Sequence, residues 1–317
     1  MRQVLKIGVS IFFIGLLIFM MRNQSKQLLS SLKQIKPFYF LSAVFLFLLI
    51  IVILSLRLKK IMEFQGLLLP LSKVTYLSLI GFFFNNFLPT SVAGDFVKAY
   101  YTAHYTQKGM ESYTSIIIDR VFGIFAFIFI ALVALCLADS QLKTPLVTNS
   151  LLFMIGFSFI FLCLFSHPLG VKHFPRILEK SRLSSLAKVA ENFGKSFRGY
   201  RNNLKLISTA LYTSFLSQIF STLVVAMLAK GLSIKIPLLL LFLTLPLIAV
   251  VSMLPSLNGL GVREGAYVFF LGNYIGKEKA LAIALLWLGV MLLVGLLGGC
   301  VYMFRELLLR EVKRDVG

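Results

Sequence analysis

Charged residues are scarce in this 317-residue sequence, and acidic residues are the scarcest of them. Charged side chains make up 14% of the chain, with 12 Asp and Glu against 32 Lys and Arg. Hydrophobic residues reach 58%, and together these values exclude an ordinary soluble domain. Charge-free runs cover residues 38–56, 74–94, 121–138, 144–166, 206–229, 236–262 and 280–304. Runs of about 18 or more apolar residues match the hydrocarbon thickness of a bilayer, so the sequence predicts a polytopic α-helical membrane protein.

Cysteine and histidine are also scarce, with three residues of each type. Cys136, Cys163 and Cys300 lie in apolar runs, where we expect them to act as small apolar side chains. Neither residue type forms a metal-binding pattern, and the GxSxG and P-loop motifs are missing. We therefore predict no metal, no cofactor and no catalytic residue, and we expect a transporter rather than an enzyme.

Basic residues are in large excess, which gives a net charge of +20. On a soluble chain this charge would indicate a nucleic-acid partner. Here the cations flank apolar runs, where they set topology and meet anionic lipid, so no nucleic acid is expected. Three basic clusters are expected to be cytoplasmic: residues 57–66, residues 167–205 and the C-terminal tail. Residues 167–205 also carry an apolar helical stripe, which indicates either an interfacial helix on anionic lipid or a solvated connector.

The three basic clusters cannot share one face of the membrane if every apolar run crosses it once. The conflict disappears if residues 67–110 dip in from the cytoplasm and residues 236–276 dip in from the outside. Spans are then expected at about 4–21, 38–56, 112–138, 145–166, 206–229 and 280–304, within one integral-membrane domain of residues 1–317. The first span lacks a small-residue cleavage site, so we interpret it as a retained helix. The cations of residues 22–36 remain outside in this topology.

Two similar breaks interrupt the apolar runs of these dips. Residues 85–95 read NNFLPTSVAGD and residues 253–264 read MLPSLNGLGVRE. Proline ends the preceding helix, and broken backbone at membrane depth is tolerated only inside protein or beside a water-filled cavity. Weak similarity between two interrupted segments is typical of inverted-repeat transporters. The sequence thus predicts an all-α membrane helix bundle with two re-entrant broken-helix hairpins in an inverted-repeat arrangement; the alternative is that each break is a purely structural kink.

Polar side chains around the breaks form the candidate site, because charge inside a membrane is costly and usually functional. Asp119 and Arg120 are adjacent in an apolar helix, so their side chains point about 100° apart and need separate partners. Arg263 and Glu264 follow glycines whose exposed N–H groups suit a phosphate. The predicted path residues are Asn85, Asn86, Pro89, Asp95, Lys98, Asp119, Arg120, Pro255, Asn258, Gly259, Gly261, Arg263 and Glu264.

Two interpretations of these charges are open. The first is a coupled polar cluster near the first break, in which Arg263 and Glu264 join Asp119 and Arg120. The second is a set of local structural roles, namely helix caps, an ion pair between Asp95 and Lys98 one turn apart, and side chains that snorkel to the helix end.

The motifs resemble the lysylphosphatidylglycerol synthase transmembrane family, also called flippase-like membrane proteins. The matching residues are Asn86, Leu88, Pro89, Gly94 and Asp95, then Asp119, Arg120 and Gly123, then Pro255, Ser256, Gly259, Gly261, Val262, Arg263, Glu264 and Gly265. The sequence departs from the family at Ala93 and Lys98, where Gly and Arg are common, and Lys is a point charge rather than a bidentate fork. The sequence also lacks the family's soluble aminoacyl-transfer domain, so aminoacyl-lipid synthesis is not expected.

The resemblance implies a lipid flippase, which we expect in the cytoplasmic membrane, moving a phospholipid or a lipid-linked head group between leaflets. Arg120 and Arg263 would engage phosphate, and the acids would pair with them or with a cationic head group. The expected partners are membrane lipids with anionic or glycosylated head groups, and a glycosyltransferase or lipid-synthesis enzyme. Two alternatives are open: an integral-membrane glycosyltransferase or its accessory subunit acting on a polyprenyl-phosphate-linked sugar, and a membrane scaffold without transport.

Overall fold

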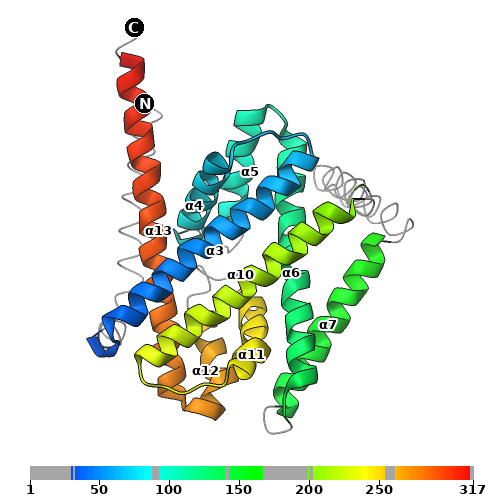
Figure 1. The fold of residues 1–317 in the computed structure, drawn as a ribbon, viewed down its shortest axis with the longest axis vertical. Helices are drawn as coiled ribbons and strands as arrows, with labels where there is room; N and C mark the ends of the chain where they lie inside the picture. Colours follow the sequence, from blue (N-terminus) through cyan, green and yellow to red (C-terminus); the bar gives the residue numbers. More distant parts are fainter. Residues whose placement is uncertain are drawn as a thin grey trace.

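The computed structural model describes residues 33–87, 93–139, 143–166, 203–253 and 261–314, together with Ser30 and Gly199. In these residues every regular element is a helix (Figure 1), which confirms the prediction of an all-α bundle. The helices are α3 (Pro37–Phe64), α4 (Leu71–Phe87), α5 (Ala93–Thr106), α6 (Gly109–Leu137), α7 (Pro145–Ser166), α10 (Leu204–Gly231), α11 (Leu238–Val251), α12 (Val262–Ile275) and α13 (Lys277–Arg314).

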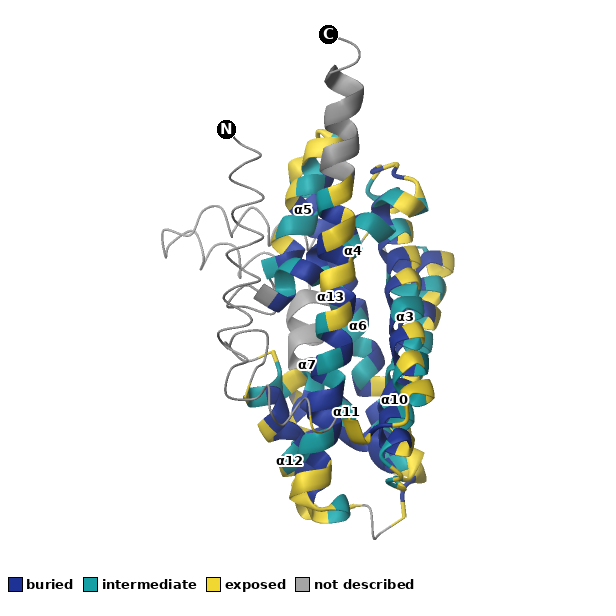
Figure 2. Cartoon of the chain, turned by 90° about the vertical axis from the view of Figure 1, so that its left-hand side faces the viewer, coloured by how far each residue is buried: buried dark blue, intermediate teal, exposed yellow. Residues whose placement is uncertain are grey.

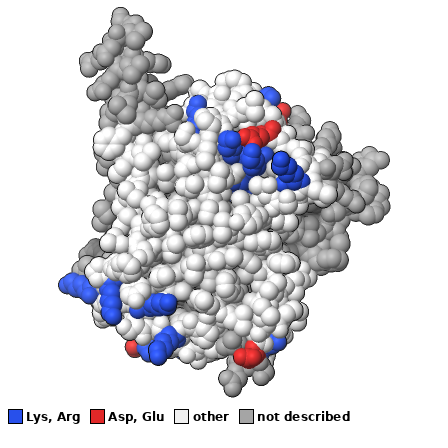
Figure 3. Space-filling model, in the orientation of Figure 1, with Lys and Arg blue, Asp and Glu red and all other residues white. Residues whose placement is uncertain are grey.

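Four of the described helices are long and apolar enough to cross a membrane. They are α3, α6, α10 and the Lys277–Phe304 part of α13. In the space-filling view, Lys, Arg, Asp and Glu gather toward two opposite ends of the molecule and a broad uncharged band separates them (Figure 3). A band of this kind is what hydrocarbon requires, because charged side chains are costly at membrane depth.

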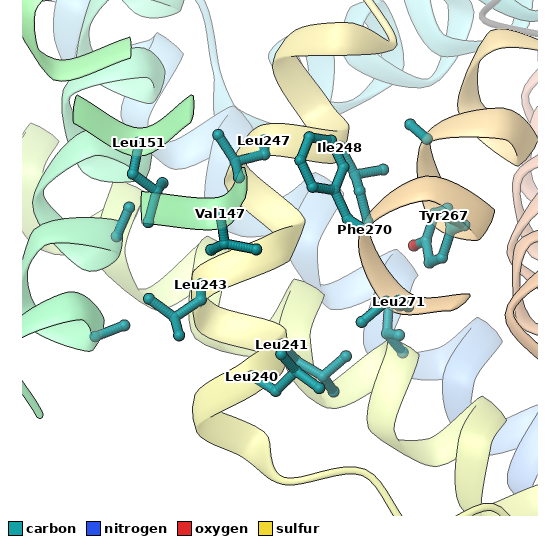
Figure 4. Packing of buried hydrophobic residues seen from close by; sticks show 14 of the residues in the cluster. Val147, Leu151, Leu240, Leu241, Leu243, Leu247, Ile248, Tyr267, Phe270 and Leu271 are labelled. Atoms are coloured by element: carbon teal, nitrogen blue, oxygen red, sulfur yellow. The ribbon is translucent and has the colours of Figure 1, made fainter. Parts of the chain in front are cut away.

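Helices α3 and α10 lie side by side and run in opposite directions across the bundle (Figure 1). Ala43 and Phe47 of α3 share one buried cluster with Val224 and Leu228 of α10. A second cluster joins α6, α7, α11, α12 and α13, and Figure 4 shows the aliphatic side chains of α7 and α11 packed beside the aromatic ones of α12. Buried residues follow the faces between helices, while exposed apolar residues cover the outside (Figure 2).

The short helices form two packed pairs, α4 with α5 and α11 with α12. The α4–α5 pair lies toward one end of the bundle and the α11–α12 pair toward the other (Figures 1 and 2). Each pair is interrupted where the sequence places a proline-containing break, so each helix is only 14 to 17 residues long. That the two pairs re-enter the membrane from opposite faces as an inverted repeat stays a prediction.

Several sequence-based expectations fall outside the described residues. They include the span at 4–21, almost all of the basic segment 167–205, and the break residues Pro89, Pro255, Asn258 and Gly259. Within the described part, helices α3, α6, α7, α10 and α13 overlap the spans expected at 38–56, 112–138, 145–166, 206–229 and 280–304.

The basic cluster at residues 57–66 is not a separate connection after the span expected at 38–56. Helix α3 continues through it to Phe64, and the Arg57 side chain is buried inside the bundle. Lys59 and Lys60 lie near the end of the helix and both pair with Glu63. Only these two lysines of the stretch can therefore act as topological signals.

Membrane orientation is testable at the two charged ends. In a variant whose three cysteines are replaced by alanine, we expect Lys60→Cys to resist a membrane-impermeant thiol reagent in intact cells and Lys235→Cys to react. The reason is the positive-inside rule, which places the end of α3 in the cytoplasm and the α10–α11 connection outside. Both lysines are exposed, so burial does not separate them. Rapid labelling of residue 60 with protection of residue 235 would reverse the orientation.

Candidate functional site

Two asparagines near the end of α4 hold the first break in place. The Asn85 Oδ1 atom accepts a hydrogen bond of 2.6 Å from the Gly94 N–H, which joins the two sides of the break. The Asn86 Nδ2 atom donates to the Met291 carbonyl of α13 at 3.0 Å. Helix α13 approaches Asn86 closely because Gly295 has no side chain; a Cβ there would lie 2.0 Å from Nδ2. The Asn85 amide therefore satisfies an N–H that the start of α5 leaves free, and the Asn86 amide ties the end of α4 to the unbroken helix α13.

Asp95 lies in the first turn of α5 and binds two cations. Its Oδ1 atom is 2.6 Å from the Lys98 Nζ atom, and its Oδ2 atom accepts from the Arg120 Nε atom of α6. The Asp95 carboxylate is buried, whereas the Arg120 side chain is 30% exposed. One acid and two cations leave the group with a net charge of +1 beside the first break.

Asp119 does not join this group, and the expected four-residue cluster is wrong for it. The Arg57 guanidinium donates to Asp119 in bidentate fashion, from Nε to Oδ1 at 2.6 Å and from Nη2 to Oδ2 at 2.9 Å. The remaining Arg57 nitrogen, Nη1, donates to the Ser214 hydroxyl at 2.8 Å, so the pair ties α6 to α3 and α10. As the sequence predicted, the adjacent Asp119 and Arg120 have separate partners on different helices.

Arg57 and Ser214 were missed by the sequence analysis. The sequence shows Arg57 only as a cation directly after a charge-free run, and its place on the buried face of α3 with Ile50 and Ile61 is seen in the structure. A cation on such a face needs a buried acid as its partner. Ser214 gives no comparable signal, because serine is common in membrane helices and its hydroxyl also bonds the Ala210 carbonyl.

The second break ends at Gly261, whose φ of +77° is a left-handed conformation suited to glycine. The Glu264 Oε2 atom accepts the Gly261 N–H at 2.6 Å and caps α12. The other oxygen, Oε1, is buried and has no hydrogen-bond partner among the residues that the structure describes. The neighbouring Arg263 is buried too, and its Nη1 atom lies 3.0 Å from the Met291 sulfur. A buried carboxylate oxygen without a donor is costly, so this position calls for an explanation beyond the helix cap.

Met291 brings the two breaks together. Asn86 of the first break contacts its backbone carbonyl, and Arg263 of the second break contacts its sulfur. Met291 lies in the middle of the 28-residue apolar stretch Lys277–Phe304, about 20 Å from either end at 1.5 Å per residue. Polar groups from both short-helix pairs thus meet at mid-depth of a spanning helix.

The geometry defines a multi-pass α-helical membrane protein with ionisable groups buried inside its helix bundle. In the described residues no three His, Cys, Asp or Glu side chains lie close enough together to hold a metal ion. A family model for the lysylphosphatidylglycerol synthase TM region matches residues 3–299, and the chain belongs to that family. No curated protein and no solved structure matches it.

Proposed function

We propose that this protein is a lipid transporter of the flippase type, which moves a phospholipid or a lipid-linked head group across the membrane. The observation that carries the proposal is the open Oε1 atom of Glu264, buried next to Arg263 where the two breaks meet. Membership of a family of lipid-related membrane regions supports the choice of a lipid as substrate.

The charges around the breaks suit a phosphate-bearing head group that also donates hydrogen bonds. Asp95, Lys98 and Arg120 together carry a net charge of +1, and the Arg120 side chain is partly exposed. These three residues therefore attract an anion. Guanidinium groups such as those of Arg120 and Arg263 bind phosphate oxygens through paired N–H donors. The open Glu264 oxygen accepts from an amine or a hydroxyl of the same head group.

An integral-membrane glycosyltransferase is the weaker candidate. Glycosyl chemistry of the common kind uses two carboxyl groups flanking one bond. Of the three acids near the breaks, Asp95 and Asp119 are both paired with cations, whereas one Glu264 oxygen has no hydrogen-bond partner in the described part of the chain.

Glu264→Gln tests the proposal. We expect roughly 10- to 100-fold slower transport at near-normal folded yield, because a hydrogen bond to a charged group contributes about 1.5–3 kcal/mol. The amide oxygen of Gln can still accept the Gly261 N–H, so the helix cap survives. Transport is measured in vesicles carrying a fluorescent phospholipid, whose exposed fraction is read by chemical quenching from outside.

The matched control is Glu278→Gln, which neutralises an exposed glutamate at the start of α13. It should transport like the unmodified protein. Equal rates for Glu264→Gln and Glu278→Gln would remove Glu264 from the path. A protein that never changes lipid exposure in such vesicles, whatever the head group, would be a scaffold instead.

A further inference from the structure

An apolar groove of about 670 Å³ lies between α6, α7, α11 and α12. Val121 and Phe125 of α6, Phe153 of α7, Val250 of α11 and Phe270 of α12 form its walls. The groove opens to the outside of the bundle, where Phe153 is 77% exposed and Val250 is 38% exposed. Its size is that of a ligand pocket rather than a packing defect.

The groove faces outward from apolar helices, so we expect it to lie in the hydrocarbon of the membrane. Val250 and Phe125 come from apolar stretches of α11 and α6, and charged residues are missing from the walls. A partner helix is a poor fit, because helix–helix contacts in membranes favour small residues that allow close approach. The walls here carry mainly bulky apolar residues, which adapt to a flexible chain, and Asn149 and Ser150 of α7 are their polar residues.

The groove leads to the second break. Val250 and Met253 lie at its edge, immediately before the break begins. Phe270 is seven residues after Arg263 on α12, so the two side chains share a face and lie about 10 Å apart along the helix axis. This spacing suits a lipid whose phosphate lies at the break while its chain runs along the walls.

We propose that the groove binds one acyl chain of the lipid whose head group lies at Arg263 and Glu264, at the start of α12. This inference rests on the proposed transport function and narrows its substrate class. The substrate must carry a hydrocarbon chain that remains in the groove while the head group crosses, so a free water-soluble phosphoester is not transported. Binding there depends on packing contacts, because moving a chain from bilayer to groove gains no hydrophobic free energy.

The test compares Val250→Trp with Val52→Trp. Both valines are apolar and similarly exposed, at 38% and 39%, but Val52 lies mid-way along α3 and away from the groove. Each protein is reconstituted in phosphatidylcholine vesicles with a trace of phosphatidylglycerol that carries a diazirine at the end of one chain. The vesicles are dissolved in excess detergent, which removes loosely bound lipid, and are then irradiated. Cross-linked peptides are mapped by mass spectrometry.

We expect the unmodified protein and Val52→Trp to be labelled on the groove walls, and Val250→Trp to be labelled roughly tenfold less. Val250→Phe, a smaller change that folds more readily, should show an intermediate loss. Labelling of the walls that is equal in all four proteins would overturn the proposal. Transport by the unmodified protein without groove labelling would reject the groove and keep the transporter. Groove labelling lost in Val250→Trp, without lipid movement by any protein, would keep the chain site and reject the transporter.

Discussion

Gly94→Ala is expected to abolish the folded protein. A Cβ at this position would lie 1.8 Å from the Gly81 carbonyl oxygen and 2.6 Å from its carbon. Both are backbone atoms of α4, so no side chain can rotate away, and α5 must separate from α4. Separation also breaks the bond from the Gly94 N–H to Asn85. The cost should exceed the roughly 1–3 kcal/mol of ordinary overpacking and use up much of the roughly 5–15 kcal/mol that stabilises a typical protein.

Gly156→Ala on α7 is the control, because nothing lies within 4 Å of a Cβ built there. In an exposed helix position this change should be neutral or stabilise the protein slightly. The readout is the monodisperse fraction of detergent-solubilised protein by size-exclusion chromatography, before and after heating. If Gly94→Ala gave the same profile as Gly156→Ala, α4 and α5 would not be in close backbone contact.

Breaking the Arg57–Asp119 pair should destabilise the protein by about 3–5 kcal/mol for either single change, Arg57→Met or Asp119→Leu. Each leaves an uncompensated charge among buried residues, since the two side chains are only 5% and 12% exposed. The double variant removes both charges and replaces them with apolar groups of similar size. It should recover most of the lost stability, because apolar replacement of a buried pair is often neutral or stabilising.

Thermal unfolding of the unmodified protein, the two single variants and the double variant measures the coupling free energy between Arg57 and Asp119. Ser214→Ala is a milder control, because it removes one neutral hydrogen-bond partner of Arg57. A double variant whose loss of stability equals the sum of the two single losses would show that the two residues act independently. Transport adds a second readout. A structural pair predicts that the double variant still moves lipid, whereas loss of transport at restored stability would place the pair in the path.

The sequence predicted the all-α membrane bundle, because long apolar runs are local signals. Contacts between distant residues were harder to predict. Helix geometry predicted that Asp119 has a different partner from Arg120. It did not predict that this partner is Arg57, which lies 62 residues earlier in the chain on another helix. Met291 gave no signal at all, since its carbonyl and sulfur become polar partners only when both breaks meet it.

The groove was unpredictable from sequence for a physical reason. In a soluble helix the buried face is apolar and the exposed face is polar, so the pattern reveals burial. In a membrane helix both faces are apolar because lipid tails are as apolar as leucine. Buried Leu247 and exposed Val250 of α11 therefore look alike in the sequence although they differ in the structure.

The adjacent positions of Asp119 and Arg120 have a mechanical consequence. Asp119 binds Arg57 of α3, which in turn donates to Ser214 of α10. Arg120 points from another side of α6 and binds Asp95 of α5. Helix α6 cannot rotate about its axis without straining one of these attachments. The Arg57 attachment is closed off from the surroundings, whereas the Arg120 attachment is partly open. If the α4–α5 pair moves relative to α6 during a transport cycle, we expect the Arg120–Asp95 ion pair to break. Helix α6 would then keep its position relative to α3 and α10.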